Sequence, residues 1–286
     1  MATSSEGVYM TEYASSRRTP NVLGSLFFYS VIGITILFIL LPILVILLYS
    51  FVGSLSGNLL ESFTFEYYRE VFDGGFDPLI LSLQLAIATT VLDVVIGVPA
   101  AYTLDRYDIP FADRLRDITI LPMAIPGIVL GIAIVRTWGV PKFGVDLSGT
   151  VLLLLIAHVI FTVPFMIQTT TSALQSIDYQ ALEETAQNLG ASWSQCFIHV
   201  LLPNIYNGIL SGAILTFALS MGEFNITLFV YNPTDKTLPI EMFGGFTTSA
   251  VGQASALSVV FVAIIIVSLW LMQYLGEQDL PKVANV

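Results

Sequence analysis

The chain has 286 residues, of which 55% are hydrophobic and 11% are charged, and its mean hydropathy is +0.82. Ordinary soluble domains carry about 25% charged residues, so this composition excludes a typical soluble enzyme and indicates a membrane protein. The net charge of −11 excludes nucleic acid as a partner, because a phosphate backbone binds basic surfaces. One cysteine and two histidines exclude a disulfide framework, a cysteine-rich metal site and a histidine-based metal centre.

Six stretches are long and apolar enough to cross a bilayer as helices, which takes about 20 residues each. Lipid offers no hydrogen-bond partner to free backbone groups, so each stretch is expected to be helical. We predict an all-α membrane protein whose transmembrane domain is residues 25–275, between tails of residues 1–24 and 276–286. In the third stretch, Gly127 and Gly131 are spaced to bring helices close together. The six predicted spans are Ser25 to Phe51, Pro78 to Tyr102, Ile118 to Thr137, Thr150 to Thr171, Ile205 to Val230 and Ala254 to Tyr274.

The first stretch follows Arg17 and Arg18, as the apolar part of a signal peptide follows a basic segment. It is longer than the roughly 7–15 apolar residues of a signal peptide and lacks a small-residue cleavage site, so we expect a membrane anchor. Positively charged loops stay in the cytoplasm, and an N-terminus placed inside leaves the larger share of Lys and Arg there. The predicted location is the cell membrane, with both termini in the cytoplasm.

The loop between the fourth and fifth spans, residues 172–204, is too long for a simple connector. Asp178 can cap a helix there, and Gly190 suits the left-handed position that ends one. Ser192 can cap a second helix that Pro203 is expected to stop. A hairpin of this kind can rest on lipid, but the loop has no Lys or Arg, so a protein groove is the better partner. The apolar face predicted for the first helix consists of Ala181, Leu182, Thr185, Ala186 and Leu189.

A longer pattern in this loop resembles that of a known family. The run Glu184-Thr185-Ala186, then Gly190, then Val200-Leu201-Leu202-Pro203 is similar to the EAA signature of ABC-importer permeases. That signature is E-A-A, three residues, Gly, nine residues and I-x-L-P, so Thr185 and Val200 are the departures. The resemblance implies the type I ABC importer permease fold, in which this loop forms coupling helices.

In that family the coupling helices dock into a dimer of cytoplasmic ATPases. The resemblance implies that Glu184 contacts the ATPase, that Ala186 and Gly190 permit close approach and the turn, and that Leu202 with Pro203 joins the loop to the fifth span. It also implies a second permease subunit, identical or a sister protein, and an extracytoplasmic binding protein. The implied coupling residues are Glu183, Glu184, Thr185, Ala186, Gly190, Leu202 and Pro203.

ATP hydrolysis is not expected in this chain itself. A P-loop requires Gly-Lys followed by Ser or Thr, whereas Lys142, Lys236 and Lys282 follow Pro, Asp and Pro. ATP and its magnesium ion are therefore expected on the partner ATPase. For this chain the sequence predicts no cofactor, no metal site and no catalytic residue.

Further stretches resemble the spermidine/putrescine permease group and favour a polyamine substrate. Permeases for iron(III), thiamine, phosphonate and molybdate use related versions, so these substrates remain alternatives. The stretches that carry this resemblance are Phe63-Thr64-Phe65-Glu66-Tyr67-Tyr68, Gly97-Val98-Pro99-Ala100-Ala101-Tyr102 with Arg106-Tyr107, Leu121-Pro122 to Pro126-Gly127, Ser220-Met221-Gly222-Glu223-Phe224 and Thr237 to Phe243.

Ionisable residues inside a membrane are costly and usually face a cavity or the interior of a bundle. Asp93 and Glu223 are two carboxylates of this kind, which suits a cationic substrate, and with Asn225 they are the predicted translocation-pathway residues. The alternative is that Glu223 is a hydrogen-bonded packing residue or a helix-end acid, and that Asp93 bonds a neighbouring helix. We expect His158 to be an interior histidine whose hydrogen bonds are satisfied.

Two other classes of membrane protein compete with a permease. An ion-coupled secondary transporter would use Asp93 and Glu223 for the ion, but it predicts two related halves around broken helices, and no such repeat is found. An intramembrane enzyme needs a catalytic pair, which the isolated Asp93 and His158 do not supply. Both alternatives leave the pattern in the long loop unexplained.

Overall fold

The computed structural model describes residues 22–52, 63–107, 112–139, 146–248 and 250–278. These residues are helical almost throughout, and the β-structure among them is confined to two isolated bridges, Val52 with Phe63 and Asn232 with Asp235. Residues 1–21 and 279–286 of the predicted tails lie outside this part of the chain, as do Arg17, Arg18, Lys142 and Lys282, which contributed to the predicted orientation. Within it, five helices are long and apolar enough to span a membrane, and a bent pair makes up to six. The predicted all-α membrane fold is confirmed.

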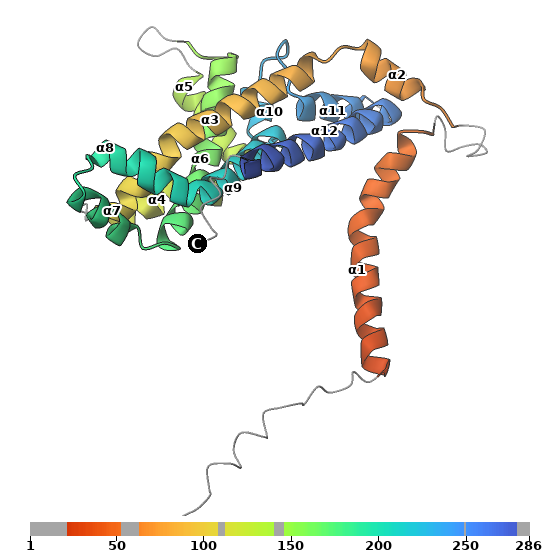
Figure 1. Cartoon of the computed structure of the whole chain (residues 1–286). Helices are drawn as coiled ribbons and strands as arrows, with labels where there is room; N and C mark the ends of the chain where they lie inside the picture. The colour runs from red at the N-terminus through yellow and green to blue at the C-terminus, as the bar shows by residue number, and fades with distance from the viewer. Residues whose placement is uncertain (1–21, 53–62, 108–111, 140–145, 249, 279–286) are drawn as a thin grey trace, which may run out of the picture. The chain divides into compact units, whose positions relative to one another are not determined.

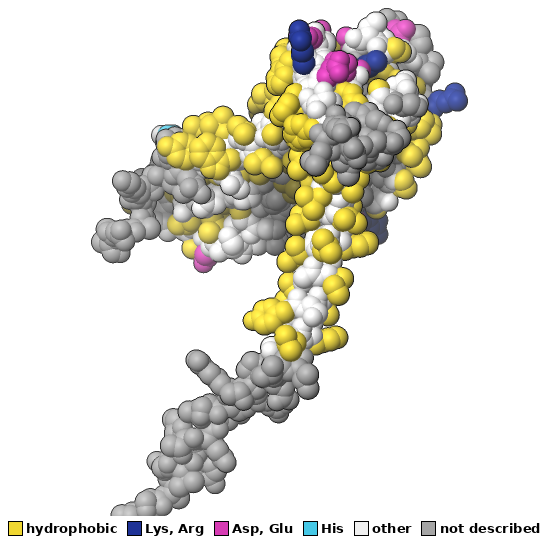
Figure 2. Space-filling view, turned by 90° about the vertical axis from the view of Figure 1, so that its right-hand side faces the viewer, with side chains coloured by type: hydrophobic (Ala, Val, Ile, Leu, Met, Phe, Trp, Pro, Cys, Tyr) yellow, Lys and Arg dark blue, Asp and Glu magenta, His cyan; other side chains and the backbone are white. Residues whose placement is uncertain are grey.

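Helix α1 (Val22–Tyr49) belongs, up to Leu48, to a first structural unit, and the residues from Tyr49 onward form a second unit, here called the body. A stretch of 18 residues in this helix has a mean hydropathy of 3.2, and apolar side chains occur on every face of the helix. Figure 2 shows hydrophobic side chains along the visible length of this helix. A helix that is apolar all round suits surroundings of lipid or other membrane helices, as predicted for the first span.

The centre of the body is made by α3 (Asp77–Arg106), α6 (Val151–Gln175) and α9 (Leu202–Met221), which pack on one another. Two glycines of α9 allow this close contact. A Cβ atom at Gly208 would collide with the side chain of Ala173, and one at Gly212 would collide with α6 as well. The long helix α12 (Val251–Gln278) packs along α9 and completes the body (Figure 1).

The third span is broken, whereas the sequence predicted a single helix from Ile118 to Thr137. Helix α4 (Ala112–Ala124) and helix α5 (Gly127–Trp138) meet at a bend of 110°. Pro126 explains the break, because it lies at the bend with φ −55° and ψ 133°. Proline also disfavours the helical conformation in the residue before it.

The fifth span ends nine residues earlier than the predicted Val230. Helix α9 stops at Met221, and α10 (Thr227–Val230) is a separate helical turn beyond an irregular segment. At its other end the span begins earlier than predicted, because α8 (Trp193–Cys196), the π-helical turn η1 (Phe197–Leu201) and α9 form one run of 29 residues.

Pro203 does not stop the helix, so the expectation that it would was wrong. It lies in the first turn of α9, where a missing N–H is tolerated. The π-helical turn just before it has already changed the hydrogen-bond pattern, since the N–H of Leu202 donates to the carbonyl of Phe197. The chain therefore passes from the loop into the fifth span without a break.

Short helices lie at the two ends of the body. At one end lie α2 (Glu66–Asp73), between the first and second spans, and α11 (Leu238–Thr247), between the fifth and sixth spans. At the other end lies α7 (Tyr179–Asn188), in the long loop before α8. Helix α3, with 30 residues and a length of about 45 Å, runs from the α2 end to the α7 end (Figure 1).

Candidate functional site

The loop between α6 and α9 folds as the predicted helix–turn–helix, here called the α7–α8 hairpin (residues 178–196). The side chain of Asp178 caps α7 by accepting a hydrogen bond from the N–H of Ala181 at 3.2 Å. Gly190 has φ +88° and makes the turn. Ser192 then starts α8 in a reciprocal capping box with Gln195. The first helix cap, the turn and the second helix cap are thus at the residues predicted from the sequence.

Glu183 ties the hairpin to the body of the protein. Its carboxylate accepts hydrogen bonds from the hydroxyl of Tyr102 and from Nε of Arg106, both near the end of α3. The glutamate side chain is 3% exposed and the arginine side chain is 35% exposed. Tyr102 and Arg106 are four residues apart, so they lie on one face of α3 and hold the same carboxylate.

This anchor was not predicted from the sequence. The resemblance implies a coupling role for Glu183, and in the structure its side chain is buried against the body. The available signal was the stretch from Gly97 to Tyr102 with Arg106, which was noted only as a resemblance and not as half of an ion pair. Glu184, the next residue, is exposed.

Aromatic rings reinforce the anchor. The ring of Phe197 stacks on Trp193 with centroids 5.6 Å apart and lies 5.1 Å from the ring of Tyr102. The hydroxyl of Tyr179 donates to the carbonyl of Asp105 at 3.2 Å, and burial raises the pKa of this phenol, so it remains a donor. The hairpin is therefore held against the end of α3 by hydrogen bonds and by ring packing. The buried cluster that the hairpin shares with the body consists of Tyr102, Leu174, Tyr179, Ala186, Cys196, Leu201 and Ile205.

Part of the hairpin surface is not covered by any residue that the structure describes, and two large apolar side chains lie there among exposed polar residues. Leu189 is 84% exposed and Trp193 is 53% exposed, and Thr185 is exposed beside them. Of the face predicted for α7, only Ala186 is buried against the body. A large exposed leucine and tryptophan on adjacent helices form a surface suited to a protein partner.

The other implied coupling residues lie at the turn and at the start of the fifth span. A Cβ atom at Gly190 would meet nothing within 4 Å, so the glycine serves the positive φ of the turn and not close packing inside the chain. Leu202 is half-buried and Pro203 is exposed in the first turn of α9.

The predicted pathway residues do not form one group. Asp93 is completely buried in the middle of α3, and neither of its carboxylate oxygens has a hydrogen-bond partner within the described part of the chain. Glu223 lies beyond the end of α9, where its carboxylate accepts hydrogen bonds from the N–H groups of Ile226 and Thr227 at 3.0 and 2.9 Å. These contacts match the alternative in which Glu223 is a helix-end acid. Asn225, two residues after Glu223, is exposed.

His158 is 1% exposed and has a partner at both ring nitrogens, as expected of a satisfied interior histidine. Nδ1 lies 2.8 Å from Oγ of Ser220, and Nε2 lies 3.0 Å from Oγ1 of Thr227. Over the residues that the structure describes, no group of three or more His, Cys, Asp or Glu side chains is placed to hold a metal ion.

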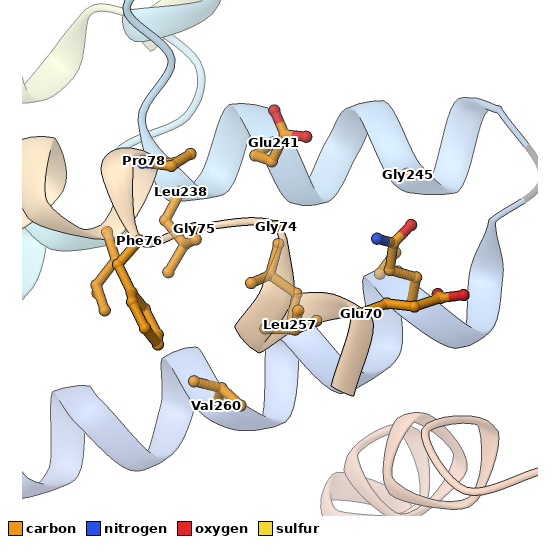
Figure 3. Close-up of a pocket in the computed structure, with 14 residues that line it drawn as sticks. Glu70, Gly74, Gly75, Phe76, Pro78, Leu238, Glu241, Gly245, Leu257 and Val260 are labelled. Carbon is orange, nitrogen blue, oxygen red and sulfur yellow. The ribbon is translucent and has the colours of Figure 1, made fainter. Parts of the chain in front are cut away.

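A cavity of about 120 Å³ opens at the α2 end of the body, far along α3 from the hairpin (Figure 3). Glu70 of α2 and Glu241 of α11 lie on opposite sides of it, and its floor includes Leu257 and Val260 of α12. Glu241 is also paired with Lys236 at 3.0 Å. The cavity and the hairpin are thus two separate surfaces at opposite ends of the body.

Comparison with known proteins agrees with this arrangement. The family model described as binding-protein-dependent transport system inner membrane component matches residues 93–278. The chain is 28% identical over 244 residues to the putative 2-aminoethylphosphonate transport system permease protein PhnV of Salmonella typhimurium, covering 85% of this chain and 91% of that protein. It is 31% identical over 200 residues to a probable molybdenum ABC transporter permease protein of Haloferax volcanii, covering 68% of this chain and 73% of that one.

Among solved structures, the chain resembles a bacterial alginate ABC transporter in complex with an alginate pentasaccharide-bound periplasmic protein, with a TM-score of 0.66. The identity is 17%, and the match covers 89% of this chain and 95% of that one, so it supports the fold. The matched relatives are permease proteins and not enzymes themselves. The chain belongs to the family of inner membrane components of binding-protein-dependent transport systems, and it is the permease subunit of an ABC importer.

Proposed function

We propose that the α7–α8 hairpin docks on a separate cytoplasmic ATPase and transmits its motion to the membrane helices. The observation that carries this proposal is the exposure of two large apolar side chains, Leu189 at 84% and Trp193 at 53%, on a hairpin that buried side chains anchor to the body. Glu184 lies exposed on the same hairpin and supplies a polar contact. A docking element with an apolar centre and a polar margin suits a groove in another protein.

The anchoring of the hairpin explains how a push on its outer face reaches the membrane. Glu183 joins α7 to the end of α3 through Tyr102 and Arg106. The run Trp193–Met221 joins α8 to the fifth span without a break. Movement of the hairpin therefore displaces α3 and α9 together, and switching between inward-facing and outward-facing states follows.

The positions of the two surfaces also support an orientation. Docking of the hairpin on the ATPase puts this end of the body in the cytoplasm, in agreement with cytoplasmic termini. The α2 end, with its acidic cavity at Glu70 and Glu241, then faces outward and offers a surface to an extracytoplasmic binding protein. A second permease subunit completes the pathway, and Asn225, exposed near the outer end of α9, is our candidate to line it.

For the substrate, we infer a small oxyanion, a phosphonate or molybdate, in place of the polyamine first favoured. The two relatives above are named for 2-aminoethylphosphonate and molybdenum transport. The polyamine prediction came from stretches that resemble the spermidine/putrescine permease group, and two carboxylates in the pathway added to it. Asp93 is fully buried, and Glu223 is occupied by backbone N–H groups, so neither carboxylate offers itself to a cation.

The docking proposal is tested by copurification of the ATPase with Leu189→Asp. A charge on the docking face is expected to lower ATPase association at least tenfold, because the carboxylate would be desolvated in the groove. Thr248→Asp adds the same charge at an exposed position at the opposite end and serves as the matched control. Equal association of both variants would contradict the proposal.

The substrate is tested by ATPase activity of the reconstituted complex with its binding protein. Stimulation by 2-aminoethylphosphonate or molybdate, and not by spermidine, is the expected result. Stimulation by spermidine alone would restore the polyamine assignment and leave the docking proposal untouched.

A further inference from the structure

We propose that His158 is a positioning residue that holds the segment after the fifth span, residues 222–230, against α6, so that movement of α9 reaches Asn225. The polar group that does this, His158, Ser220, Glu223 and Thr227, is called the clasp below. The inference rests on the proposed function, because it concerns how motion that enters at the hairpin arrives at the far end of the same helix.

The element proposed to carry the movement is the continuous helix Trp193–Met221. With 29 residues it is about 43 Å long, and it has the docking face at one end. Ser220 lies in its last turn, and Glu223 follows two residues after the end. The helix therefore delivers any displacement of the hairpin directly to the clasp.

The hydrogen bonds of the clasp fit one consistent assignment. The carboxylate of Glu223 only accepts, so the hydroxyl of Thr227, 3.0 Å from its Oε2, donates to it. This hydroxyl then accepts from Nε2–H of His158 at 3.0 Å, which leaves Nδ1 to accept from the hydroxyl of Ser220 at 2.8 Å. Each side chain satisfies the next, and His158 joins α6 by hydrogen bonds to both α9 and α10.

Because the clasp is buried, the loss of one of its hydrogen bonds is energetically costly. The four residues are between 0% and 7% exposed, and no water-facing alternative is open to their polar atoms. A buried polar network in which one member is removed leaves its partners unsatisfied. Loss of the imidazole therefore frees Ser220 and Thr227 together.

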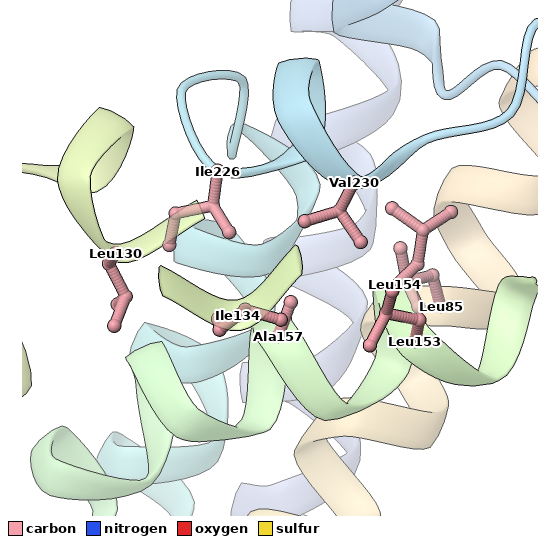
Figure 4. Close-up of a cluster of buried hydrophobic side chains, with 8 residues drawn as sticks. All are labelled: Leu85, Leu130, Ile134, Leu153, Leu154, Ala157, Ile226 and Val230. Carbon is pink, nitrogen blue, oxygen red and sulfur yellow. The ribbon is translucent and has the colours of Figure 1, made fainter. Parts of the chain in front are cut away.

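The segment is also seated from its other side, on the helix that follows the break in the third span. Ile226 and Val230 point into an apolar cluster with Leu130 and Ile134 of α5 and with side chains of α6 (Figure 4). A Cβ atom at Gly131 would lie 3.0 Å from the carbonyl oxygen of Ile226, so this glycine allows the segment to lie directly on α5.

Asn225 is thereby exposed between two fixed neighbours. Glu223 is fixed through its bonds to the N–H groups of Ile226 and Thr227, and Ile226 is fully buried in the apolar cluster. The clasp thus sets the position of the exposed amide while leaving it free to contact a substrate. His158 acts through Ser220 and Thr227 and needs no contact with the substrate.

The test is made on the complete reconstituted complex of permeases, ATPase and binding protein, with 2-aminoethylphosphonate or molybdate as the probe, whichever stimulates the wild type. Uptake and ATP hydrolysis are measured together. His158→Ala is expected to lower uptake at least tenfold while hydrolysis stays within twofold, so the ATP used per substrate rises about tenfold. His158→Gln, whose amide N–H can replace the Nε2 donor to Thr227, is expected to recover part of the coupling.

Two further variants guard against a simple loss of folding. Thr227→Val keeps the shape of the side chain and removes the hydroxyl that joins His158 to Glu223, so it is expected to raise the same ratio. Thr90→Val removes a buried hydroxyl that bonds only within its own helix, to the carbonyl of Ala86 at 2.8 Å, and is expected to leave the ratio unchanged.

The outcomes separate the two proposals. A wild-type complex that couples normally, with His158→Ala and Thr227→Val keeping the wild-type ratio or losing uptake and hydrolysis in proportion, would overturn the clasp and leave the proposed function in place. A wild-type complex with no hydrolysis stimulated by the binding protein would overturn both.

Discussion

Arg106, the last residue of α3, donates from Nε to the carboxylate of Glu183 in α7, 77 positions further along the chain. The glutamate is buried and the arginine is partly open to solvent. Tyr102 occupies the other carboxylate oxygen. These contacts attach the hairpin firmly to α3. The proposed coupling role requires such an attachment between the docking surface and a membrane helix.

Removal of Glu183 is expected to loosen the hairpin. Glu183→Ala leaves the hydroxyl of Tyr102 buried without its partner and removes a hydrogen bond to a charged group, and such losses cost about 1.5–3 kcal/mol. We expect a lower melting temperature of the purified subunit and weaker association with the ATPase. Thermal unfolding is followed by intrinsic tryptophan fluorescence, to which Trp193 of the hairpin contributes as one of three tryptophans.

The neighbouring acid provides the control for this prediction. Glu184 is exposed, so Glu184→Ala is expected to change the free energy of unfolding by less than about 0.5 kcal/mol. ATPase association is expected to fall in both variants, whereas stability is expected to fall only for Glu183→Ala. Equal stability of the two variants would show that the buried pair does not anchor the hairpin.

Gly190 is expected to resist substitution for a backbone reason alone. Its φ of +88° is unfavourable for any residue with a Cβ atom, and the space around it is open. Gly190→Ala is therefore expected to cost about 1–2 kcal/mol, measured by thermal unfolding. Gly244→Ala, inside α11 with an equally open Cβ position, is expected to be neutral or slightly stabilising. A similar loss at both positions would contradict the assignment of the cost to φ.

The hairpin could be predicted from the sequence because its signals are local. Asp178, Gly190 and Ser192 each act on the backbone within a few residues, through a cap, a left-handed turn and a capping box. The spans were predictable for a similar reason, since lipid requires a long apolar helix wherever it is crossed.

The rest depended on contacts that no local pattern encodes. The partner of Glu183 is 77 residues away, and the segment after the fifth span is held by Glu223, just beyond α9, and by His158 of α6, which lies far from it in the sequence. Residues 226–230 are mostly apolar, like the residues of α9, so hydropathy did not predict that the helix ends at Met221. At Pro126 a signal was present, but proline bends some membrane helices and ends others, and the fold decides which.

Asp93 is a carboxylic acid buried in the middle of α3. Its side chain is 0% exposed and neither oxygen has a hydrogen-bond partner among the described residues, and a buried charge in that position is strongly unfavourable. Asp93→Asn keeps the shape and removes the charge, so we expect a higher melting temperature in thermal unfolding of the purified subunit. Asp178→Asn, at an exposed helix cap where either residue caps well, is expected to leave the melting temperature unchanged. A lower melting temperature for Asp93→Asn alone would mean that the carboxylate has a stabilising partner.

Gly131 is expected to control how the segment after the fifth span rests on α5. An added Cβ atom would lie 3.0 Å from the carbonyl oxygen of Ile226 and 3.2 Å from its Cα, both backbone atoms that cannot rotate away. Gly131→Ala must therefore push the segment off α5, at a cost of about 1–3 kcal/mol for an overpacked contact. Because the segment carries Asn225, uptake is expected to fall more than the melting temperature alone would suggest, and hydrolysis per substrate is expected to rise as in His158→Ala. Both are measured in the reconstituted complex, with Gly244→Ala as the control. Unchanged coupling in Gly131→Ala would show that contact with α5 does not position the segment, and the task of holding Asn225 would then fall to the hydrogen bonds of His158 and Glu223.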